Sequence, residues 1–535
     1  MSKVVTTGDQ SRQKIKAGID LVANVVKTTL GPRGRNIVLD TDPYRNPLNT
    51  NDGVTIAREL HSKDDFEEVG VKIVKAVANK TNDVAGDGTT TASILLQAMT
   101  THGLQQINNG ADPVMLRRGI EKAADAVIEA LQDEIVETKD LEALVNVATI
   151  SCGDPVIGKL VAEAVHKVGS EGVVTIEDAE AEDTSSRIAE GIELRGGIQL
   201  PAFITNPARQ EADISDVPIF VTDHDITNGL EIVKLMEVCA ANGHKTAALI
   251  ANSVTGEAMA SAVINKAQGK FTLIPIKVQA LGEQGQAVLR DMAAATGGTF
   301  FARDEGNRLP NNPNDSYDFN LFGHAERVIS SKDRTTILGG AGDAEERIKE
   351  LEAQVENLVR AFEKNNMKER IAKLRSGVGV IRVGGVTETE REERKLRVED
   401  AINASKAALS NGVIAGGGAA LYRAASKVQK DKLVDLSTED GNGIMAVVKA
   451  CFEPIKQMAL NSSLELDKAD LERVSADKKL TIDFYTGQVV NAFDAGIIDP
   501  SLVTVSAVKN AASEAALFVI TEGAVAITED NSEKI

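Results

Sequence analysis

The sequence predicts a multidomain protein in which both ends of the chain build one mostly α-helical domain and an α/β domain is inserted between them. Three observations favour this architecture. The 535 residues are too many for a single hydrophobic core. Helical apolar periodicity dominates the first 133 residues and returns from about residue 387, whereas short apolar strands alternate with helices in between.

The first section is expected to be helical, with glycine-bearing turns between its helices. Apolar residues recur with helical spacing from Ile15 to Val26, and the pattern stops at Leu30–Gly34, where glycine and proline force a turn. Residues 36–40 predict a short strand. Apolar periodicity then predicts further helices at 64–80, 88–108 and 112–133.

From about residue 134 the chain predicts alternating strands and helices. The predicted elements are strands at 171–177, 218–222, 248–251 and 272–277, with helices at 228–242 and 255–267. Residues 376–383 predict a further strand. From Thr387 to about residue 519 the pattern is again largely helical, and the chain ends in a short β-prone piece and a polar tail.

Composition excludes several classes of protein. The chain carries 59 Lys and Arg against 79 Asp and Glu, a net charge of −20, and only 3% of its residues are aromatic; both values disfavour a nucleic-acid partner. Three separated cysteines and six histidines without paired spacing predict neither a disulfide framework nor a zinc site. The N-terminus lacks the apolar segment of a signal peptide and no run approaches a membrane span, so we expect a cytoplasmic protein without a membrane partner.

The segment Ala85–Thr91 has the composition of a phosphate-binding turn. Two glycines flank Asp87, and three threonines follow where a helix is expected to begin. A helix N-terminus presents unpaired N–H groups to an anion, and a carboxylate beside it can hold Mg²⁺ against phosphate oxygens. The same residues also suit an ordinary capped turn between two helices, so this segment alone leaves both interpretations open.

Other glycine loops, at 31–34, 52–53 and 416–418, accompany this segment, whereas no P-loop motif and no GxGxxG between a strand and a helix occur. Hydrolysis of a bound phosphoanhydride requires a group that orients or deprotonates water. Asp52 and Asp400 are the candidates for that role. Acidic residues usually lie on solvated surfaces, so the residue pattern alone favours Asp400 as an ordinary helix-surface carboxylate.

Six motifs occur in the order found in bacterial group I (GroEL-type) chaperonins, and the chain resembles that family from about Val5 to Glu522. The motifs are Thr29–Asn36, Asn51–Val54, Ala85–Thr91, Arg397–Asp400, Ala415–Gly418 and Gly496–Pro500. Six ordered motifs are far more specific than one glycine loop. The resemblance implies an ATP-driven ring chaperonin that captures non-native polypeptides and assists their folding in a closed cavity.

The resemblance also implies domain boundaries and a nucleotide site. The helical ends would be an equatorial ATPase domain (1–133 and 411–535), joined through a small α/β intermediate domain (134–188 and 379–410) to an α/β apical domain (189–378). Asp52 and Asp400 would serve hydrolysis, Asp87 would bind Mg²⁺, and K⁺ would be an additional cation. The nucleotide contacts carried over are Thr29, Leu30, Gly31, Pro32, Asp87, Gly88, Thr89, Thr90, Thr91, Gly417 and Asp499.

The apical domain of this family presents apolar side chains to unfolded protein and to a co-chaperonin of the GroES type. The matching positions are Phe203, Val233, Met236, Met259, Val263 and Ile264. The spacing of the last five is also that of ordinary helix core, which the pattern by itself favours. The resemblance further implies a homo-oligomer of one or two heptameric rings.

Several departures from the family pattern keep a second interpretation open. Asn51 stands where a lysine is common, and Asp483–Tyr485 replaces a small, polar run beside the base. Gly197, Ile198 and Ala202 occupy an apical segment in which two tyrosines are expected. The alternative is therefore a divergent ring ATPase with a dedicated partner or scaffold role and no general folding activity.

Overall fold

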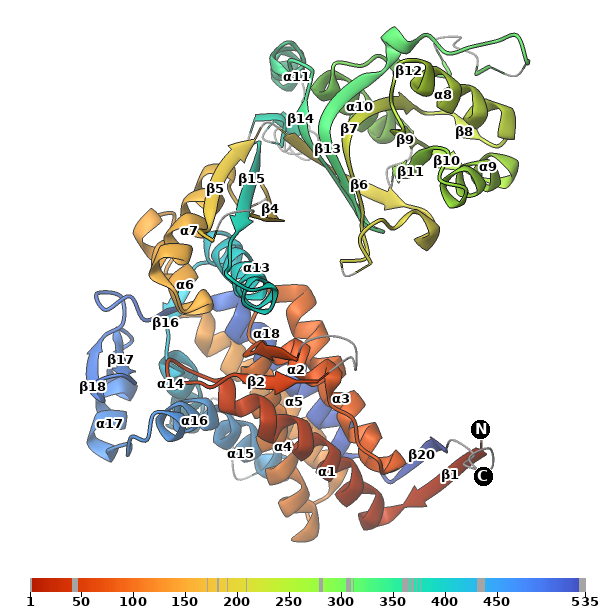
Figure 1. Ribbon diagram of the computed structural model, residues 1–535. Helices are drawn as coiled ribbons and strands as arrows, with labels where there is room; N and C mark the ends of the chain where they lie inside the picture. The colour runs from red at the N-terminus through yellow and green to blue at the C-terminus, as the bar shows by residue number, and fades with distance from the viewer. Residues whose placement is uncertain are drawn as a thin grey trace. The chain divides into compact units, whose positions relative to one another are not determined.

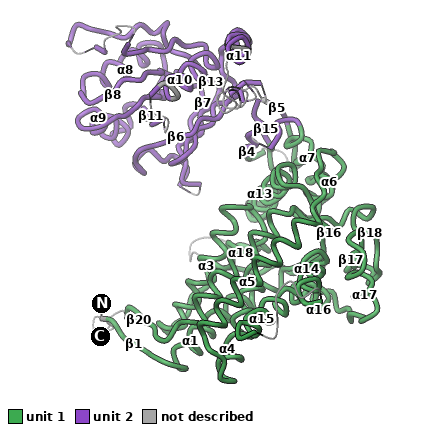
Figure 2. The backbone as a smooth tube through the Cα atoms, turned by 180° about the vertical axis from the view of Figure 1, so that it is seen from behind, with its two compact units in different colours: residues 1–166, 176–186, 381–535 green, residues 167–175, 187–380 purple. Residues whose placement is uncertain are grey.

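The chain forms two compact units, and the helical unit is built from both ends of the chain (Figure 2). Unit 1 comprises residues 1–166, 176–186 and 381–535, and unit 2 comprises residues 167–175 and 187–380. The predicted insertion of an α/β domain between two helical sections is thus confirmed, while the finer five-part division stays a prediction. The computed structural model describes residues 2–40, 47–170, 172–179, 182–189, 191–207, 209–278, 282–304, 309–310, 312–357, 364, 367, 370–371, 373–375, 377–430 and 438–528.

Unit 1 is dominated by long helices (Figure 1), and the predicted helices of the first section are confirmed with their ends shifted by a few residues. Its first group of helices is α1 (Gly8–Val26), η1 (Lys27–Thr29), α2 (Gly53–Glu59), α3 (Asp65–Ala85), α4 (Thr89–Asn108), α5 (Pro113–Gln132), α6 (Leu141–Cys152) and α7 (Pro155–Val168), the end of which belongs to unit 2. Its second group is α13 (Glu388–Asn411), α14 (Ala419–Lys430), α15 (Gly441–Cys451), α16 (Glu453–Asn461), α17 (Lys468–Ala476) and α18 (Ser501–Val519).

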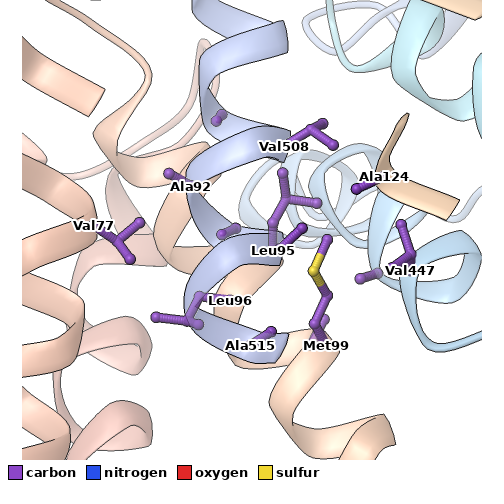
Figure 3. Close-up of a cluster of buried hydrophobic side chains, with 14 of the residues drawn as sticks. Val77, Ala92, Leu95, Leu96, Met99, Ala124, Val447, Val508 and Ala515 are labelled. Carbon is purple, nitrogen blue, oxygen red and sulfur yellow. The ribbon is translucent and has the colours of Figure 1, made fainter. Parts of the chain in front are cut away.

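The core of unit 1 joins helices that are far apart in the sequence. Figure 3 shows Leu95 and Met99 of α4 packed beside Val508 of α18 and Val447 of α15. All four side chains are fully buried. Because the buried face of α18 is rich in alanine, including Ala515, neighbouring helices can approach its axis closely.

Helices α5 and α15 pack with backbone against backbone. A Cβ atom on Gly119 of α5 would lie 2.0 Å from the carbonyl oxygen of Asp440, and one on Gly443 of α15 would lie 2.1 Å from the carbonyl oxygen of Leu116. Neither distance leaves room for a side chain. The two helices therefore require glycine at their point of contact.

Helix α18 corrects one expectation from the sequence. Among the described helices it is long and apolar enough to cross a membrane by length and composition alone, although we expected no such run. Of its most apolar window, 67% is buried inside the protein. The helix therefore buries most of this apolar surface in the helical core of unit 1, as core helices of globular proteins do.

Short strand pairs complete unit 1 and tie its two chain ends together. The strands are β1 (Ser2–Thr7), β2 (Ile37–Leu39), β3 (Leu48–Thr50), β16 (Val413–Ala415), β17 (Leu480–Asp483), β18 (Gln488–Asn491), β19 (Ile498–Pro500) and β20 (Gly523–Thr528). Strand β1 pairs antiparallel with β20, so that Ser2 lies opposite Thr528 and Thr7 opposite Gly523. The pairs β2–β3, β16–β19 and β17–β18 are also antiparallel.

Unit 2 is organised around a seven-stranded mixed sheet of order β12-β7-β13-β14-β6-β11-β9, in which β7 also pairs with β9. Its strands are β6 (Gly191–Ile198), β7 (Ala212–Thr222), β9 (Thr246–Ala251), β11 (Thr272–Val278), β12 (Phe300–Phe301), β13 (Gly323–Ser330) and β14 (Arg334–Gly340). A separate parallel pair is formed by β8 (Asp225–Ile226) and β10 (Ser253–Val254). The remaining elements are η2 (Pro201–Phe203), α8 (Gly229–Ala241), α9 (Gly256–Ala267), α10 (Gly282–Thr296), η3 (Phe319–Leu321) and α11 (Glu345–Asn357).

The chain passes from one unit to the other through the strands of a small three-stranded sheet. Its order is β4-β15-β5, formed by β4 (Val173–Asp178), β5 (Ser185–Ala189) and β15 (Val378–Val383). The predicted strands at 171–177 and 376–383 correspond to β4 and β15. The strands predicted in the middle of the chain therefore belong either to the seven-stranded sheet or to this small sheet.

Candidate functional site

The turn between α3 and α4 is built by two glycines in the left-handed backbone region. Gly86 ends α3 with φ 68° and Gly88 precedes α4 with φ 86°. A side chain is disfavoured at both positions, since this region suits glycine. No side chain caps α4 at Gly88. The first N–H groups of α4, at Thr89 to Thr91, therefore stand at a helix N-terminus without a side-chain cap.

Both glycines are also required by their surroundings. A Cβ atom on Gly86 would lie 2.1 Å from Cβ of Asn403, and one on Gly88 would lie 2.5 Å from Cγ1 of Val503. Asn403 belongs to α13, one helical turn after Asp400, so the two residues share a face of that helix. The turn is thus packed against the helix that carries Asp400.

Asp87 is held inside this turn. Its Oδ1 accepts a hydrogen bond from the Gly88 N–H at 2.5 Å, and its Oδ2 accepts one from Ser151 Oγ at 3.4 Å. The side chain keeps part of its surface open to solvent. Burial nevertheless raises the pKa of Asp87, and the negative charge of Asp52 raises it further.

Asp52 caps α2 beside the same turn. Its carboxylate accepts hydrogen bonds from the N–H groups of Val54 at 3.1 Å and Thr55 at 3.0 Å, as an N-cap residue does. A Cβ atom on the next residue, Gly53, would lie 2.6 Å from Oγ1 of Thr89 and 2.7 Å from Oγ1 of Thr90. The start of α2 therefore lies against the start of α4.

Asp400 belongs to this cluster and is no ordinary helix-surface carboxylate. Burial raises its pKa well above the usual range, and the charges of Asp52 and Asp87 add to that effect. Three carboxylates from α2, α13 and the turn before α4 therefore interact electrostatically. The residue pattern by itself favoured a solvated Asp400, whereas the structure makes it half-buried, because α13 packs its Asp400 face against the turn.

The loop after α1 contacts the same helix N-terminus. Thr29 is buried, and its Oγ1 lies 3.3 Å from Oγ1 of Thr90. Leu30 is half-buried, whereas Gly31 and Pro32 are exposed. The side of this loop formed by Thr29 therefore faces the turn, while its tip remains open.

The fourth glycine loop approaches from the last part of the chain. Strand β16 pairs with β19 so that Ile414 lies opposite Asp499. A Cβ atom on Gly416 would lie 2.9 Å from Oδ1 of Asp499. Burial raises the pKa of Asp499 to about 7, and the charge of Asp87 contributes. Gly417, with φ 67°, follows directly.

Crowded carboxylates of this kind fit a divalent cation bound together with phosphate. The charges that raise the pKa values of Asp87, Asp400 and Asp499 come from other carboxylates, so a cation would relieve the repulsion. Among the described residues no three His, Cys, Asp or Glu side chains form a metal cage on their own. Mg²⁺ typically binds through one or two carboxylates plus phosphate oxygens and waters, which suits this arrangement.

The apolar residues proposed for polypeptide binding lie in unit 2 and differ in exposure. Phe203 is fully buried, and Met236 is 5% exposed. Both belong to the core between the sheet and its helices, so the expectation that they present an apolar surface is not met here. Ile264 is 53% exposed. The partly buried side chains that pack against that core are Val233, Met259 and Val263.

Two residues that hold the site were not singled out from the sequence. Ser151 of α6 donates to Asp87, and Thr481 Oγ1 donates to the carbonyl oxygen of Gly416 at 2.8 Å. A serine late in an apolar helix and a threonine in a short strand carry no recognisable pattern. Only the packing of α6 and β17 gives them a role at the site.

Comparison with known proteins identifies the family and the fold of this chain. Residues 22–525 match the sequence model of the TCP-1/cpn60 chaperonin family. The structure is similar to that of the chaperonin gp146 from bacteriophage EL 2 (Pseudomonas aeruginosa), crystallised in the presence of ATP-BeFx. For crystal form II the TM-score is 0.70 at 21% identity, covering 98% of this chain and 100% of the other. For crystal form I the TM-score is 0.64 at 22% identity, covering 98% and 99%. The chain therefore belongs to the TCP-1/cpn60 chaperonin family.

Proposed function

We propose that this chaperonin binds Mg-ATP at the turn between α3 and α4, hydrolyses it, and uses the cycle to assist the folding of non-native polypeptides. The observation that carries the proposal is the carboxylate cluster of Asp52, Asp87 and Asp400 beside the uncapped start of α4. Such a site attracts a cation and a phosphate together. The related phage chaperonin was crystallised with an ATP analogue, which supports the same ligand here.

Different residues of this chain would bind the phosphates, hold the metal ion and activate the attacking water. The N–H groups of Thr89 to Thr91 would hold phosphate oxygens, and Asp87 would hold Mg²⁺, which when bound would neutralise charge on those oxygens. Asp400 would accept a proton from the attacking water. Burial and the charges of Asp52 and Asp87 raise the pKa of Asp400, which makes its carboxylate a stronger base. Asp52 would orient the water from the N-terminus of α2.

Polypeptide capture is proposed for the apolar surface of α8 and α9 in unit 2. Ile264 of α9 supplies an exposed side chain, and Val233 of α8 and Met259 and Val263 of α9 are partly accessible. Apolar contacts are non-directional, so such a surface would accept many sequences. Methionine favours promiscuity further because it is flexible and polarizable.

The assembly and partners follow from family membership. Chaperonins act on other polypeptides as ring oligomers, and we propose that this chain forms heptameric rings, works with a GroES-type co-chaperonin and is cytoplasmic. The alternative is a divergent ring ATPase with a dedicated partner. The absence of the two expected tyrosines near Gly197 and Ala202 favours that alternative. Particle size and symmetry by electron microscopy would establish the number of rings.

Asp400→Ala tests the nucleotide site. We expect ATP binding to persist while turnover falls by about 10²- to 10⁴-fold, the usual contribution of general acid–base catalysis. Steady-state phosphate release and equilibrium binding of ATP measure the two quantities. Glu392→Ala is the matched control, because Glu392 lies on α13 and is ion-paired at 2.7 Å with Lys395 rather than placed in the cluster. Normal turnover in the Asp400 variant would refute the assignment.

Aggregation suppression separates the two versions of the proposal. Several unrelated unfolded proteins are offered to the wild-type assembly, with ATP and with or without a GroES-type co-chaperonin. A general folding chaperonin suppresses aggregation of most of them and releases active protein. Hydrolysis of ATP without suppression of any of them would favour the dedicated-partner alternative.

A further inference from the structure

Four strands of the large sheet in unit 2 run parallel to one another, in the order β12-β7-β9-β11. From β7 the chain passes through α8 to β9 and then through α9 to β11, each time moving to the next strand on the same side (Figure 1). It then passes through α10 to β12, which lies on the other side of β7. The winding direction therefore reverses between β7 and β12. In doubly wound α/β folds a ligand crevice forms at such a point, outside the carboxyl ends of the strands.

A cavity of about 310 Å³ lies at this edge of the sheet. Asp223, Asn252 and Arg303 line it, and they follow the carboxyl ends of β7, β9 and β12. Val278, at the end of β11, and Leu289 of α10 are buried and give the cavity an apolar wall. The other lining residues are Gly282, Gly285, Gln286 and Asp304. The cavity has the size of a small-ligand site, and the nucleotide site proposed above uses none of these residues.

Asp223 contributes a carboxylate to this cavity, and its charge is uncompensated. Its Oδ1 accepts a hydrogen bond from the Arg303 backbone N–H at 2.7 Å, and its Oδ2 accepts one from Gln286 Nε2 at 2.9 Å. Both donors are neutral groups. No cationic side chain in the described part of the chain is ion-paired with Asp223. Each carboxylate oxygen can accept a second hydrogen bond, so Asp223 is fixed in position and can still bind a cation.

Asp225 compensates the charge of Arg303 next to the cavity. Its Oδ2 is ion-paired with Nη2 of Arg303 at 3.0 Å, while its Oδ1 accepts hydrogen bonds from Asn252 Nδ2 and Ser253 Oγ, both at 2.6 Å. The bonds from Ser253 and Arg303 lower the pKa of Asp225, so its carboxylate stays charged. Asn252 and Gln286 both donate through their amide nitrogens, so their amide oxygens remain as acceptors at the cavity.

The side chain of an arginine fits this combination of groups. A guanidinium carries five N–H donors and no acceptor, and its planar edge binds a carboxylate through two parallel hydrogen bonds. The apolar wall suits the methylene stem of the side chain. An anion would be repelled by the charge of Asp223. A divalent metal ion is also disfavoured, because no three His, Cys, Asp or Glu side chains among the described residues form a cage for it.

The cavity lies at the N-terminal ends of the two helices proposed to capture polypeptides. Asn252 directly precedes β10, after which α9 begins at Gly256. Asp223 precedes β8, after which α8 begins at Gly229. Strands β8 and β10 pair with each other, so the starts of the two helices are held together. A polypeptide on the apolar surface of α8 and α9 can therefore reach the cavity with a neighbouring side chain.

We propose that this cavity binds the guanidinium group of an arginine in a captured polypeptide, with Asp223 as its ion partner. The amide oxygens of Asn252 and Gln286 accept hydrogen bonds from the remaining N–H groups. The chaperonin therefore favours clients that carry an arginine close to an apolar segment. This inference rests on the polypeptide capture proposed above and names the class of client.

Pairs of peptides test the arginine site. The probe is a series of fluorescein-labelled peptides that share one apolar segment and carry a single arginine at increasing distance from it. Each peptide has a twin in which citrulline replaces the arginine, which keeps the shape of the side chain and removes its charge. At the best spacing, the assembled wild-type protein should bind the arginine peptide about 10- to 100-fold more tightly than its twin, because hydrogen bonds to charged groups are strong. Fluorescence anisotropy measures both affinities.

Two variants separate the cavity from the general negative charge of the protein. Asp223→Asn keeps the size of the side chain and removes its charge, so the preference for arginine should fall to about twofold or less. The affinity of this variant for the citrulline peptides should equal that of wild type, which shows that the capture surface is intact. Glu257→Gln is the matched control, because Glu257 is an exposed carboxylate in the first turn of α9 and does not line the cavity. It should keep the wild-type preference.

The possible failures are distinguishable. If the wild-type protein binds neither peptide of any pair, the proposed capture of polypeptides is itself wrong, and the arginine site falls with it. If it binds both members of every pair with affinities within about twofold, the arginine site is refuted and apolar capture stands. If arginine is preferred but Asp223→Asn changes that preference no more than Glu257→Gln does, the preference comes from the overall charge and the role of the cavity is refuted.

Discussion

Asp499 makes stability depend on pH in a way that one substitution can isolate. Burial and the charge of Asp87 raise its pKa from 3.8 to about 7. The folded state therefore binds this proton more tightly than the unfolded state does. Stability contributed by the protonated carboxyl is complete below pH 3.8 and is lost as the pH rises through about 7. Asp499→Asn removes the titrating group and with it this dependence.

The size of the effect follows from the two pKa values. One unit corresponds to about 1.36 kcal/mol, so the whole interval from 3.8 to about 7 is worth about 4 kcal/mol. Between pH 5 and pH 8 the contribution of Asp499 to the free energy of unfolding falls by about 2.5 kcal/mol. We therefore expect the stability difference between wild type and Asp499→Asn to change by about that amount, in favour of the variant at the higher pH.

Urea unfolding midpoints of the nucleotide-free proteins, recorded from pH 5 to pH 8, test this reasoning. Asp494→Asn is the matched control for the loss of a negative charge, because Asp494 is an exposed carboxylate in the preceding turn. A difference between wild type and Asp499→Asn that stays constant across this range would refute the electrostatic account. If Asp499→Asn became less stable relative to wild type at pH 8, the pH dependence would have the opposite sign to the one expected.

Three further substitutions test packing, charge burial and polypeptide capture. Gly443→Ala should lower the free energy of unfolding by about 1–3 kcal/mol in urea titrations, because the new Cβ would lie 2.1 Å from a carbonyl oxygen of α5. Arg423→Met should cost about 3–5 kcal/mol in the same assay, since it leaves Glu134 buried without its ion pair; wild-type stability would contradict this. Val263→Ser should weaken capture of an unfolded client in a pull-down while ATP turnover persists. Ala260→Ser is the control, because Ala260 is an exposed position on α9. If both variants captured the unfolded client equally well, Val263 would serve only the core and not the binding surface.

The sequence by itself determined the elements and the family. Helical periodicity predicted α3, α4 and α5, because each helix buries a continuous apolar face and its pattern is local. The ends of α4 and α5 agree within one residue, whereas α3 continues to Ala85, beyond the predicted end at residue 80. The alternation of strands and helices between them predicted the insertion. Six ordered motifs indicated the chaperonin family, which the match over residues 22–525 confirms.

Only the tertiary structure decided which of the predicted side chains share an environment. From the sequence, Asp400 is an acidic residue on a polar helix, and the pattern by itself favoured a solvated position. Packing of Asn403 against Gly86 brings that face of α13 to the turn, and the burial that results raises the pKa of Asp400. Met236 shows the converse, since a helical apolar spacing does not distinguish a core face from a binding surface. Burial and charge coupling are properties of contacts between distant segments, and a local pattern cannot report them.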